Sequence, residues 1–152
     1  KEGPLNNPAD RDHCLHYMIA VGLLHGTLIA EHYEDVFHHG DARIDKLRSL
    51  MTIEEDPAYT RDYLDPDKRS IPNALQVEFT DGGKTEKVAV EYPIGHRRRR
   101  AEGIPLLEAK FIANLRTRFP ERQCQRIVEL CSKQADLEVT PVDRFSDLWT
   151  IN

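Results

Sequence analysis

The sequence predicts an α+β domain, in which helices pack on a small antiparallel sheet. Three observations indicate this class: helical apolar spacing before residue 52, one β-hairpin pattern between residues 74 and 92, and further helical patterns towards the C-terminus. The hairpin has an apolar face that must be covered, and the helices that flank it in the sequence are the candidates. We expect residues 1–120 to form the α+β domain. Residues 121–152 are expected to form helices that dock on it or on further protein.

Composition excludes several classes of protein. The 152 residues are 39% hydrophobic and 31% charged, and their formal net charge is −5. This charge argues against a nucleic-acid-binding domain, and no apolar run approaches the roughly 18–20 residues that span a bilayer. No signal peptide is visible, but a cut N-terminus could have lost one. The modest apolar share suits a segment that docks on more protein, although a highly charged surface explains it equally well.

The first third of the chain is predicted to form three helices. They cover residues 10–25, 28–39 and 42–51, where apolar residues recur at helical spacing. Residues suited to N-caps and helix stops bound them: Asp10 or Asp12, Gly26, Thr27, Gly40 and Asp41.

The middle of the chain is predicted to form an irregular connection and then a β-hairpin. Residues 56–73 are rich in proline and turn-forming pairs, with one helical turn around residues 59–63. The hairpin strands are residues 74–80 and 84–92, which alternate apolar and polar side chains, and Asp81-Gly82-Gly83 between them accepts positive φ. The apolar face of this hairpin consists of Leu75, Val77, Phe79, Val88, Val90 and Tyr92.

Prolines divide the remainder of the chain into helices. Pro93 ends the second strand, and Pro105 can occupy the first position of a helix that reaches Arg118. Pro120 separates it from a helix over residues 121–135, and a short helix follows Pro141.

The cysteines do not predict a disulfide framework. There are three of them, an odd number, with no CxxC pair. Cys124 and Cys131 are seven residues apart in a predicted helix, which is too far for a bridge. We expect them to be reduced, small apolar residues.

The first predicted helix contains the strongest candidate for proton chemistry. His13 and Tyr17 are four residues apart, so both would project from the same side of a continuous helix, and His16 lies close to them. An imidazole beside a phenol makes a proton-transfer pair. The alternative is a core helix whose His and Tyr satisfy only local hydrogen bonds, and spacing alone favours that alternative.

Four consecutive arginines follow Gly95-His96 in this acidic chain. Guanidinium groups bind carboxylates through paired hydrogen bonds, and a loop between a strand and a helix is a suitable place for an anion. Nucleic-acid binding is disfavoured because no aromatic residue interrupts the run. The remaining alternative is a solvated loop that pairs with acids such as Glu91 and Glu102. Because adjacent residues cannot all face one ligand, we expect at most one or two of the four to contact it.

A metal site is not predicted. The seven histidines form no HExxH motif, and no carboxylate completes a ligand triad with them. The pairs that could contribute are His13 with His16 and His38 with His39, while His25 and His32 stand alone. No glycine-rich phosphate loop and no nucleophile elbow is present.

An ordered set of motifs over nearly the whole chain resembles the MmgE/PrpD family. No single motif is diagnostic, but their order is. They are Asp10-Arg11-Asp12-His13-Cys14 with Tyr17-Met18, Arg43 to Arg48, Glu55-Asp56-Pro57, Asp65 to Ile71, Val77 to Gly82, Val90 to His96, and Gly103-Ile104-Pro105. By this resemblance the chain is about the last third of such an enzyme.

The resemblance implies an activity. Dehydratases of the family remove water from 2-methylcitrate to give 2-methylaconitate in propionate breakdown, without a metal or other cofactor. Relatives decarboxylate cis-aconitate or epimerise iminodisuccinate. A dehydratase is the expected function, with a cis-aconitate decarboxylase-like enzyme, or a non-catalytic interaction module that retains the fold, as alternatives.

The resemblance also implies site residues and partners. The family builds its site between a large helical domain and a smaller α+β domain, and a tyrosine near that site corresponds to Tyr17. Tyr17 and His13 are the expected catalytic residues, and His96, Arg97 and Arg98 the expected substrate contacts. The ligand would be a small tricarboxylate, and the partners the helical domain and a second copy in a homodimer. Neither nucleic acid nor membrane is expected.

Two differences limit the transfer of the family's site residues to this chain. His16 stands where the family's dehydratases usually carry glutamine, and the family's other site histidines and lysines precede this segment. The isolated chain is therefore expected to be inactive. Its parent would be cytoplasmic in a bacterium and would belong to the mitochondrial matrix in a eukaryote.

Overall fold

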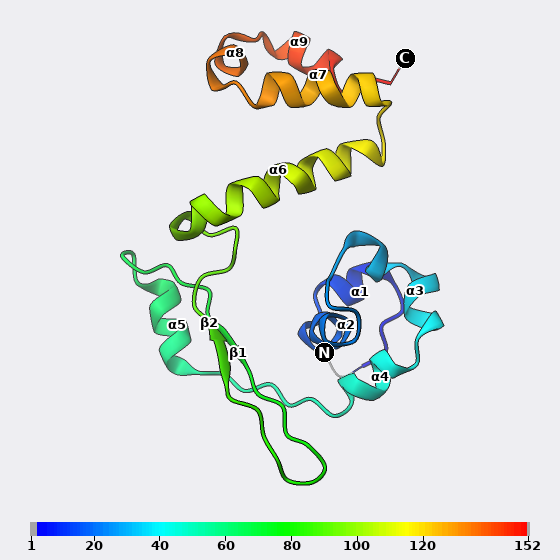
Figure 1. Cartoon of the computed structure of the whole chain (residues 1–152), viewed down its shortest axis with the longest axis vertical. Helices are drawn as coiled ribbons and strands as arrows, with labels where there is room; N and C mark the ends of the chain where they lie inside the picture. Colours follow the sequence, from blue (N-terminus) through cyan, green and yellow to red (C-terminus); the bar gives the residue numbers. More distant parts are fainter. Residues whose placement is uncertain (1–2, 152) are drawn as a thin grey trace. The chain divides into compact units, whose positions relative to one another are not determined.

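The computed structural model describes residues 3–151, and the chain divides into two compact units, Lys1–Glu55 and Asp56–Asn152. Figure 1 shows a mainly helical chain with one short antiparallel sheet, which confirms the α+β class. Each unit is built around its own set of apolar side chains.

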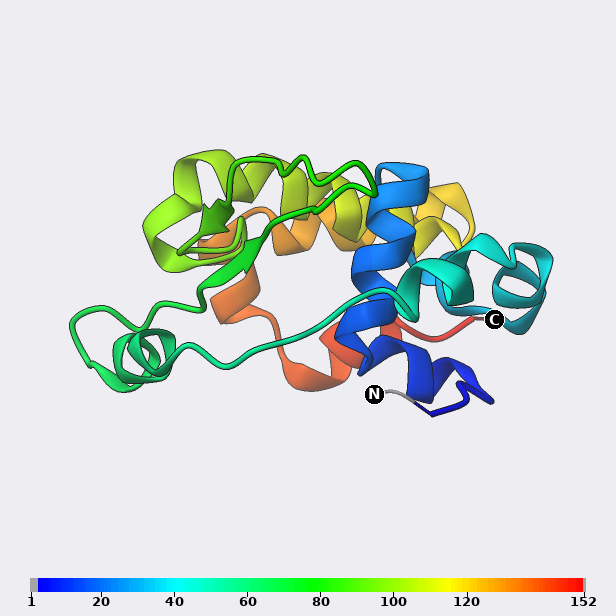
Figure 2. The ribbon, with the colours of Figure 1, turned by 90° about the horizontal axis from the view of Figure 1, so that it is seen from below.

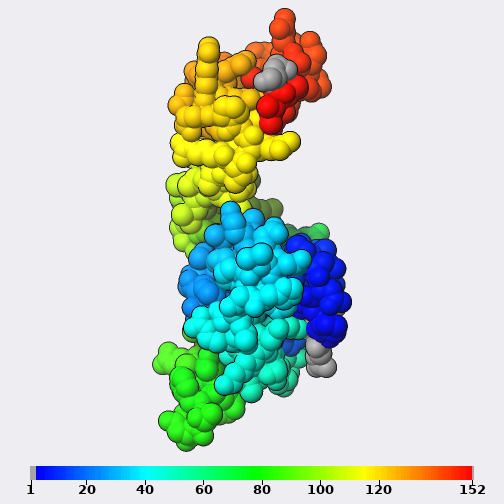
Figure 3. Space-filling model, turned by 90° about the vertical axis from the view of Figure 1, so that its right-hand side faces the viewer, coloured from blue at the N-terminus to red at the C-terminus, as the bar shows by residue number. Residues whose placement is uncertain are grey.

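Within residues 3–55, the described part of the first unit, there are four α-helices and one 3₁₀ helix. In Figure 3 its atoms, coloured from blue to cyan, form a continuous packed body. Tyr17, Val21 and Ile44 lie fully buried at its centre. The elements are α1 (Pro8–Asp12), α2 (Leu15–His25), η1 (Ala30–Tyr33), α3 (Asp35–Gly40) and α4 (Arg43–Arg48).

The first predicted helix is wrong in one respect, because it is two helices rather than one. α1 ends at Asp12, and Cys14 has an extended backbone before α2 begins. The cap of α1 is also one that we did not predict: Asn7 accepts a hydrogen bond from the backbone N–H of Asp10 at 2.9 Å. The break lets Arg11 and Cys14 both point into the core, where each is completely buried.

The second predicted helix is also divided, because Glu34 is extended between η1 and α3. Two side chains of the preceding helices donate hydrogen bonds to carbonyl oxygens that would accept backbone hydrogen bonds in a continuous helix. The Tyr17 hydroxyl donates to the His32 carbonyl at 2.5 Å, and Arg11 Nε donates to the Tyr33 carbonyl at 2.6 Å. The predicted boundaries at Gly26 and Gly40 are confirmed, and Gly26 has the positive φ of a helix stop.

The second unit begins with α5 (Pro57–Leu64), which Asp56 caps by accepting a hydrogen bond from the Ala58 N–H. The predicted hairpin follows, with β1 (Asn73–Leu75) paired to β2 (Val88–Val90). Gly82 forms the turn with φ 87°. The regular strands are shorter than predicted, but an isolated bridge between Glu78 and Lys84 continues the pairing towards the turn.

The hairpin contains a one-residue offset of the kind that a β-bulge produces. Three residue steps separate Leu75 from Glu78, whereas four separate their partners Val88 and Lys84. Beyond the offset, the backbone N–H of Phe79 donates to Gly83.

The offset keeps charged side chains off the apolar face. Under the register of β1 and β2, Glu86 and Lys84 would oppose Val77 and Phe79. With the offset, Val77 instead pairs with Thr85, and Lys84 forms an ion pair with Glu78 at 2.5 Å on the opposite side.

The C-terminal helices form the second apolar cluster. Figure 2 shows α6 (Arg100–Arg116) and α7 (Glu121–Cys131) lying along one another, and Leu115, Cys124 and Ile127 are buried between them. The short helices α8 (Gln134–Val139) and α9 (Val142–Asp147) follow, and Leu148 packs on the same cluster.

Two helix boundaries in this unit differ from the prediction. α6 begins at Arg100, after the 3₁₀ turn η2 (Arg97–Arg99), so Pro105 lies inside the helix rather than at its first position. The helix predicted over residues 121–135 stops at Cys131, where the Ser132 hydroxyl donates to the Val128 carbonyl at 2.5 Å. The short helix after Pro141 is confirmed.

Candidate functional site

The structure does not bring His13 and Tyr17 together as a proton-transfer pair. The break between α1 and α2 removes the four-residue helical relationship on which the pair depended. The His13 side chain is 84% exposed and lies 2.5 Å from the Asp12 carboxylate. Hydrogen bonding to Asp12 raises the pKa of His13 above its ordinary value. His13 is therefore an accessible imidazole with a carboxylate partner.

Tyr17 lies in the core of the first unit. Its hydroxyl is committed to the His32 carbonyl, and the edge of its ring faces the His38 ring at a centroid distance of 5.4 Å. Burial raises the pKa of the Tyr17 phenol. The phenol is consequently a neutral hydrogen-bond donor, and it fixes the carbonyl of a histidine-rich segment.

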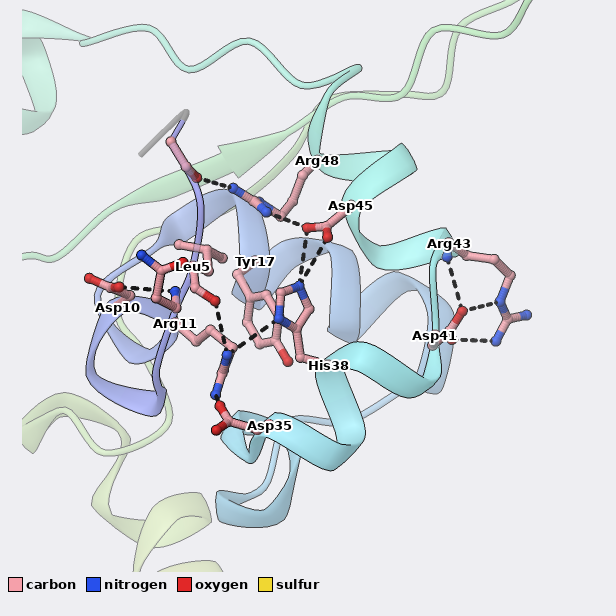
Figure 4. A network of polar contacts seen from close by, with 12 residues as sticks. Leu5, Asp10, Arg11, Tyr17, Asp35, His38, Asp41, Arg43, Asp45 and Arg48 are labelled. Carbon is pink, nitrogen blue, oxygen red and sulfur yellow. Dashed lines mark hydrogen bonds and ion pairs between the residues drawn. The ribbon is translucent and has the colours of Figure 1, made fainter.

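Arg11 is the centre of the polar network around Tyr17, as Figure 4 shows. Its guanidinium is fully buried and donates to the carbonyls of Leu5 and Tyr33 and to the Asp35 carboxylate. It also contacts Nδ1 of His38 at 3.3 Å. A buried guanidinium is stable only when it is hydrogen-bonded, and these four partners give each of its three nitrogens at least one contact.

The same network continues from His38 to the surface. His38 Nε2 lies 3.1 Å from the Asp45 carboxylate, which also pairs with Arg48. Burial would raise the pKa of Asp45, but the hydrogen bonds from His38 and Arg48 outweigh it, and the pKa lies below its ordinary value. Asp45, Arg48 and His16 line an open pocket of about 460 Å³. This unit therefore presents an ionised carboxylate and two basic groups at one pocket.

The arginine run is divided between structural and accessible side chains. Arg98 donates to the Asp67 carbonyl and lies over the Tyr92 ring, 5.0 Å from its centroid. Arg99 donates to the Tyr92 carbonyl and pairs with Glu102 at 2.8 Å. These two side chains hold the loop in place.

The predicted residues His96 and Arg97 line a second open pocket. Its volume is about 440 Å³, and its other lining residues include Arg69. Which of the four arginines contact a ligand stays a prediction, and of the four only Arg97 lines this pocket. Arg69 was not among the predicted site residues.

Sequence reasoning also missed Arg11, His38 and Asp45 as a connected group. Their separations along the chain are 27 and 7 residues, and no spacing rule links them. The available signal was the placement of Arg11 in a conspicuous motif. That signal did not reveal that the side chain is buried.

Two kinds of site are absent from residues 3–151. No group of three or more His, Cys, Asp or Glu side chains in this part of the chain is arranged to hold a metal ion. Within the same residues, no helix combines the length and the apolar composition that crossing a bilayer requires.

Comparison with known proteins gives consistent matches over the whole chain. The sequence profile of the MmgE/PrpD C-terminal domain matches residues 1–134. The 2-methylcitrate dehydratases of Salmonella typhimurium strain LT2 and Escherichia coli strain K12 are 57% and 56% identical to this chain over 151 residues. These matches cover 99% of the chain but only 31% of either relative.

A eukaryotic relative matches the same stretch. The mitochondrial 2-methylcitrate dehydratase of Yarrowia lipolytica is 46% identical over 149 residues, which is 98% of the chain and 28% of that protein. The chain thus spans about a third of the length of the curated relatives that it matches.

Proposed function

The chain belongs to the MmgE/PrpD C-terminal domain family, and from this premise we propose that it forms the C-terminal part of a 2-methylcitrate dehydratase. The observation that supports this most strongly is the 57% identity to a 2-methylcitrate dehydratase across 99% of the chain. The proposed reaction is the elimination of water from 2-methylcitrate to give 2-methylaconitate. The named relatives favour this dehydratase over a cis-aconitate decarboxylase of the same family.

The proposed reaction sets three chemical requirements. A base must remove a proton from a carbon beside a carboxylate, an acid must protonate the departing hydroxyl, and cationic groups must hold the carboxylates as negative charge develops. None of these steps requires a metal, and we propose a metal-independent lyase. The second open pocket, with Arg69, His96 and Arg97 around it, supports the third requirement.

We propose different parts for the two expected catalytic residues. The exposed ring of His13, with Asp12 behind it, is suited to exchange a proton with a substrate. Tyr17 is suited to orient the segment around His32, because its buried hydroxyl holds that backbone carbonyl. Of the proposed substrate contacts, His96 and Arg97 line a pocket, and Arg98 supports the loop that carries them.

The activity is proposed for a longer protein than this chain. Because the chain spans 31% of the bacterial relatives, we propose that a helical domain preceding it completes the site and that the whole enzyme is a homodimer. Such an enzyme would work in the cytoplasm of a bacterium or in the mitochondrial matrix of a eukaryote.

The first test is the intact mass of the native protein, together with its activity. A mass well above 17.5 kDa, with turnover of 2-methylcitrate measured from the absorbance of the new conjugated double bond, is expected. The isolated 152-residue chain should show no turnover in the same assay. A native species of 17.5 kDa without activity would instead identify a binding module that retains the fold of an enzyme.

The Tyr17→Phe variant of the whole enzyme tests the part proposed for Tyr17. We expect kcat to fall by about tenfold or more, while stability falls by only about 1–2 kcal/mol because one buried hydrogen bond is lost. Loss of stability with unchanged kcat in the folded fraction would assign Tyr17 a purely structural role.

A further inference from the structure

Two connecting segments of the second unit lie side by side, between α5 and the start of α6 (Figure 1). One leads from α5 to β1 and contains Asp67 and Arg69, and the other leads from β2 to η2 and contains His96. His96 Nε2 lies 3.0 Å from the Arg69 carbonyl, and Arg98 donates to the Asp67 carbonyl. These contacts join segments that are 27 and 31 residues apart, so the pocket between them has a defined shape.

His96 has only one neutral tautomer that fits its contacts. The backbone N–H of Arg98 donates to Nδ1 at 3.2 Å, so Nδ1 is an acceptor. Nε2 then carries the proton and donates to the Arg69 carbonyl. His96 is thereby held in place and fixes Arg69, whose φ of 48° is in the left-handed region that few non-glycine residues adopt.

The lining of this pocket is basic and contains no acid. Its members are Arg69, Ile71, Pro93, Gly95, His96 and Arg97. Beside it, Ser70 is fully buried, and its hydroxyl has no hydrogen-bond partner within residues 3–151. A pocket with this lining favours an anionic ligand.

The two arginine side chains of the pocket remain available. In the described part of the chain, neither Arg69 nor Arg97 forms an ion pair, whereas the neighbouring Lys68 pairs with Asp62 at 2.8 Å and Arg99 pairs with Glu102. The chain has 26 acidic residues and 21 Lys and Arg residues, so arginines without acidic partners are not explained by a shortage of acids.

We propose that Arg69 and Arg97 together bind a carboxylate group of a small polycarboxylate. Each guanidinium offers paired N–H donors that match the two oxygens of a carboxylate. The inference rests on the proposed function for the choice of polycarboxylate. It adds Arg69 as a residue that determines specificity, and it assigns Arg98 a supporting rather than a binding role. A phosphate group presents the same oxygen chemistry and is therefore the competing ligand.

Kinetics of the whole enzyme test the site directly. Arg69→Gln and Arg97→Gln should each raise KM for 2-methylcitrate by roughly 10–100-fold, with a much smaller change in kcat and an unchanged melting temperature. Arg100→Gln is the matched control, because Arg100 is an exposed member of the same arginine run outside the pocket. An unchanged KM in both folded pocket variants would overturn the inference while leaving the dehydratase proposal intact.

Binding of a non-reacting ligand separates this inference from the proposed function. Calorimetry with tricarballylate on the same enzyme should show binding that each of the two pocket substitutions weakens and Arg100→Gln does not. If that pattern appears in an enzyme that does not dehydrate 2-methylcitrate, the function fails and the carboxylate site stands. Inorganic phosphate should bind much more weakly. Equal or tighter binding of phosphate would overturn the assignment to a polycarboxylate.

Discussion

Arg11 determines which nitrogen of His38 carries the proton. The guanidinium has donors only, so its 3.3 Å contact with Nδ1 makes that nitrogen an acceptor. The proton of the neutral ring must then lie on Nε2, where it is donated to Asp45 at 3.1 Å. A buried cation, an oriented imidazole and an ionised carboxylate thus form one directed chain of hydrogen bonds through the first unit.

Replacing Arg11 should loosen the whole first unit. Arg11→Met would leave the carbonyls of Leu5 and Tyr33 without their donor and would release His38, at a cost of about 3 kcal/mol. Hydrogen exchange followed by mass spectrometry should show lost protection in α2 and α3 but not in α7. Arg116→Met is the control, because Arg116 and its partner Glu121 are both exposed, and their loss should cost less than about 1 kcal/mol. Equal effects of the two variants would contradict the central role of Arg11.

Gly103 should tolerate no side chain. A Cβ at this position would lie 2.2 Å from the Ile94 carbonyl oxygen, so α6 and the segment after β2 would have to separate. Gly103→Ala should therefore lower the free energy of unfolding by roughly 2–3 kcal/mol, as measured by urea denaturation.

Gly22 provides the opposite case within a helix. Apart from its chain neighbours and the backbone of its own helix, no described atom lies within 4 Å of a Cβ built there, so Gly22→Ala in α2 should stabilise the protein by about 0.5–1 kcal/mol. If Gly103→Ala were as harmless as Gly22→Ala, this result would contradict the close packing of α6 against the Ile94 carbonyl.

The cluster between α6 and α7 should respond to truncation of Ile127. This side chain is fully buried, and Ile127→Ala should cost about 2–4 kcal/mol through lost burial and the cavity that remains. Trp149, the single tryptophan, contacts Phe119 and Phe145 in the same unit, so its fluorescence reports the transition. Val142→Ala should change stability by less than about 0.5 kcal/mol, because Val142 is exposed. A larger effect at Val142 than at Ile127 would contradict the packing.

Acid should destabilise the first unit through Asp41 and Asp45. Hydrogen bonding to Arg43 lowers the pKa of Asp41, and the contacts with His38 and Arg48 lower that of Asp45 despite burial. A carboxyl whose folded pKa is depressed stabilises the fold above its ordinary value of 3.8. That stabilisation is lost as the pH falls from this value through the folded pKa.

Urea midpoints measured by circular dichroism between about pH 7 and pH 3 test this dependence. Asp41→Asn and Asp45→Asn should each reduce the fall of the urea midpoint at acid pH. Asp143→Asn, which removes an exposed carboxyl from α9, should leave that fall unchanged. An unaltered fall in the Asp41→Asn, Asp45→Asn double variant would show that other groups control acid unfolding.

Local signals predicted the elements whose causes are local. The Asp81-Gly82-Gly83 turn, the helical turn after Asp56 and the short helix after Pro141 all appear where the sequence indicates them. The breaks at Cys14 and Glu34 have a distant cause, since Arg11 reaches the Tyr33 carbonyl 22 residues later and Tyr17 reaches His32 15 residues later. The spacing of apolar residues along the sequence does not predict such long-range hydrogen bonds.

The same division between local and distant causes applies to the candidate site. His96 and Arg97 followed from an unusual run of basic residues, and both line the basic pocket. Arg69 also lines that pocket, and the contact that links it to His96 joins residues 27 positions apart in the chain. Helical spacing placed His13 and Tyr17 on one face because it assumes a continuous helix. The break at Cys14 separates them, and spacing does not reveal that break.

The one-residue offset in the hairpin makes the length of its second strand adjustable in one direction. Deleting Glu86 or Lys87 would leave three residue steps between Lys84 and Val88, equal to the three between Glu78 and Leu75. Both pairs would then fit one uninterrupted register, and Lys84 would still face Glu78. Inserting a residue would instead widen the mismatch to two. An alignment of related proteins should therefore tolerate a one-residue gap between residues 84 and 88 and contain few insertions there.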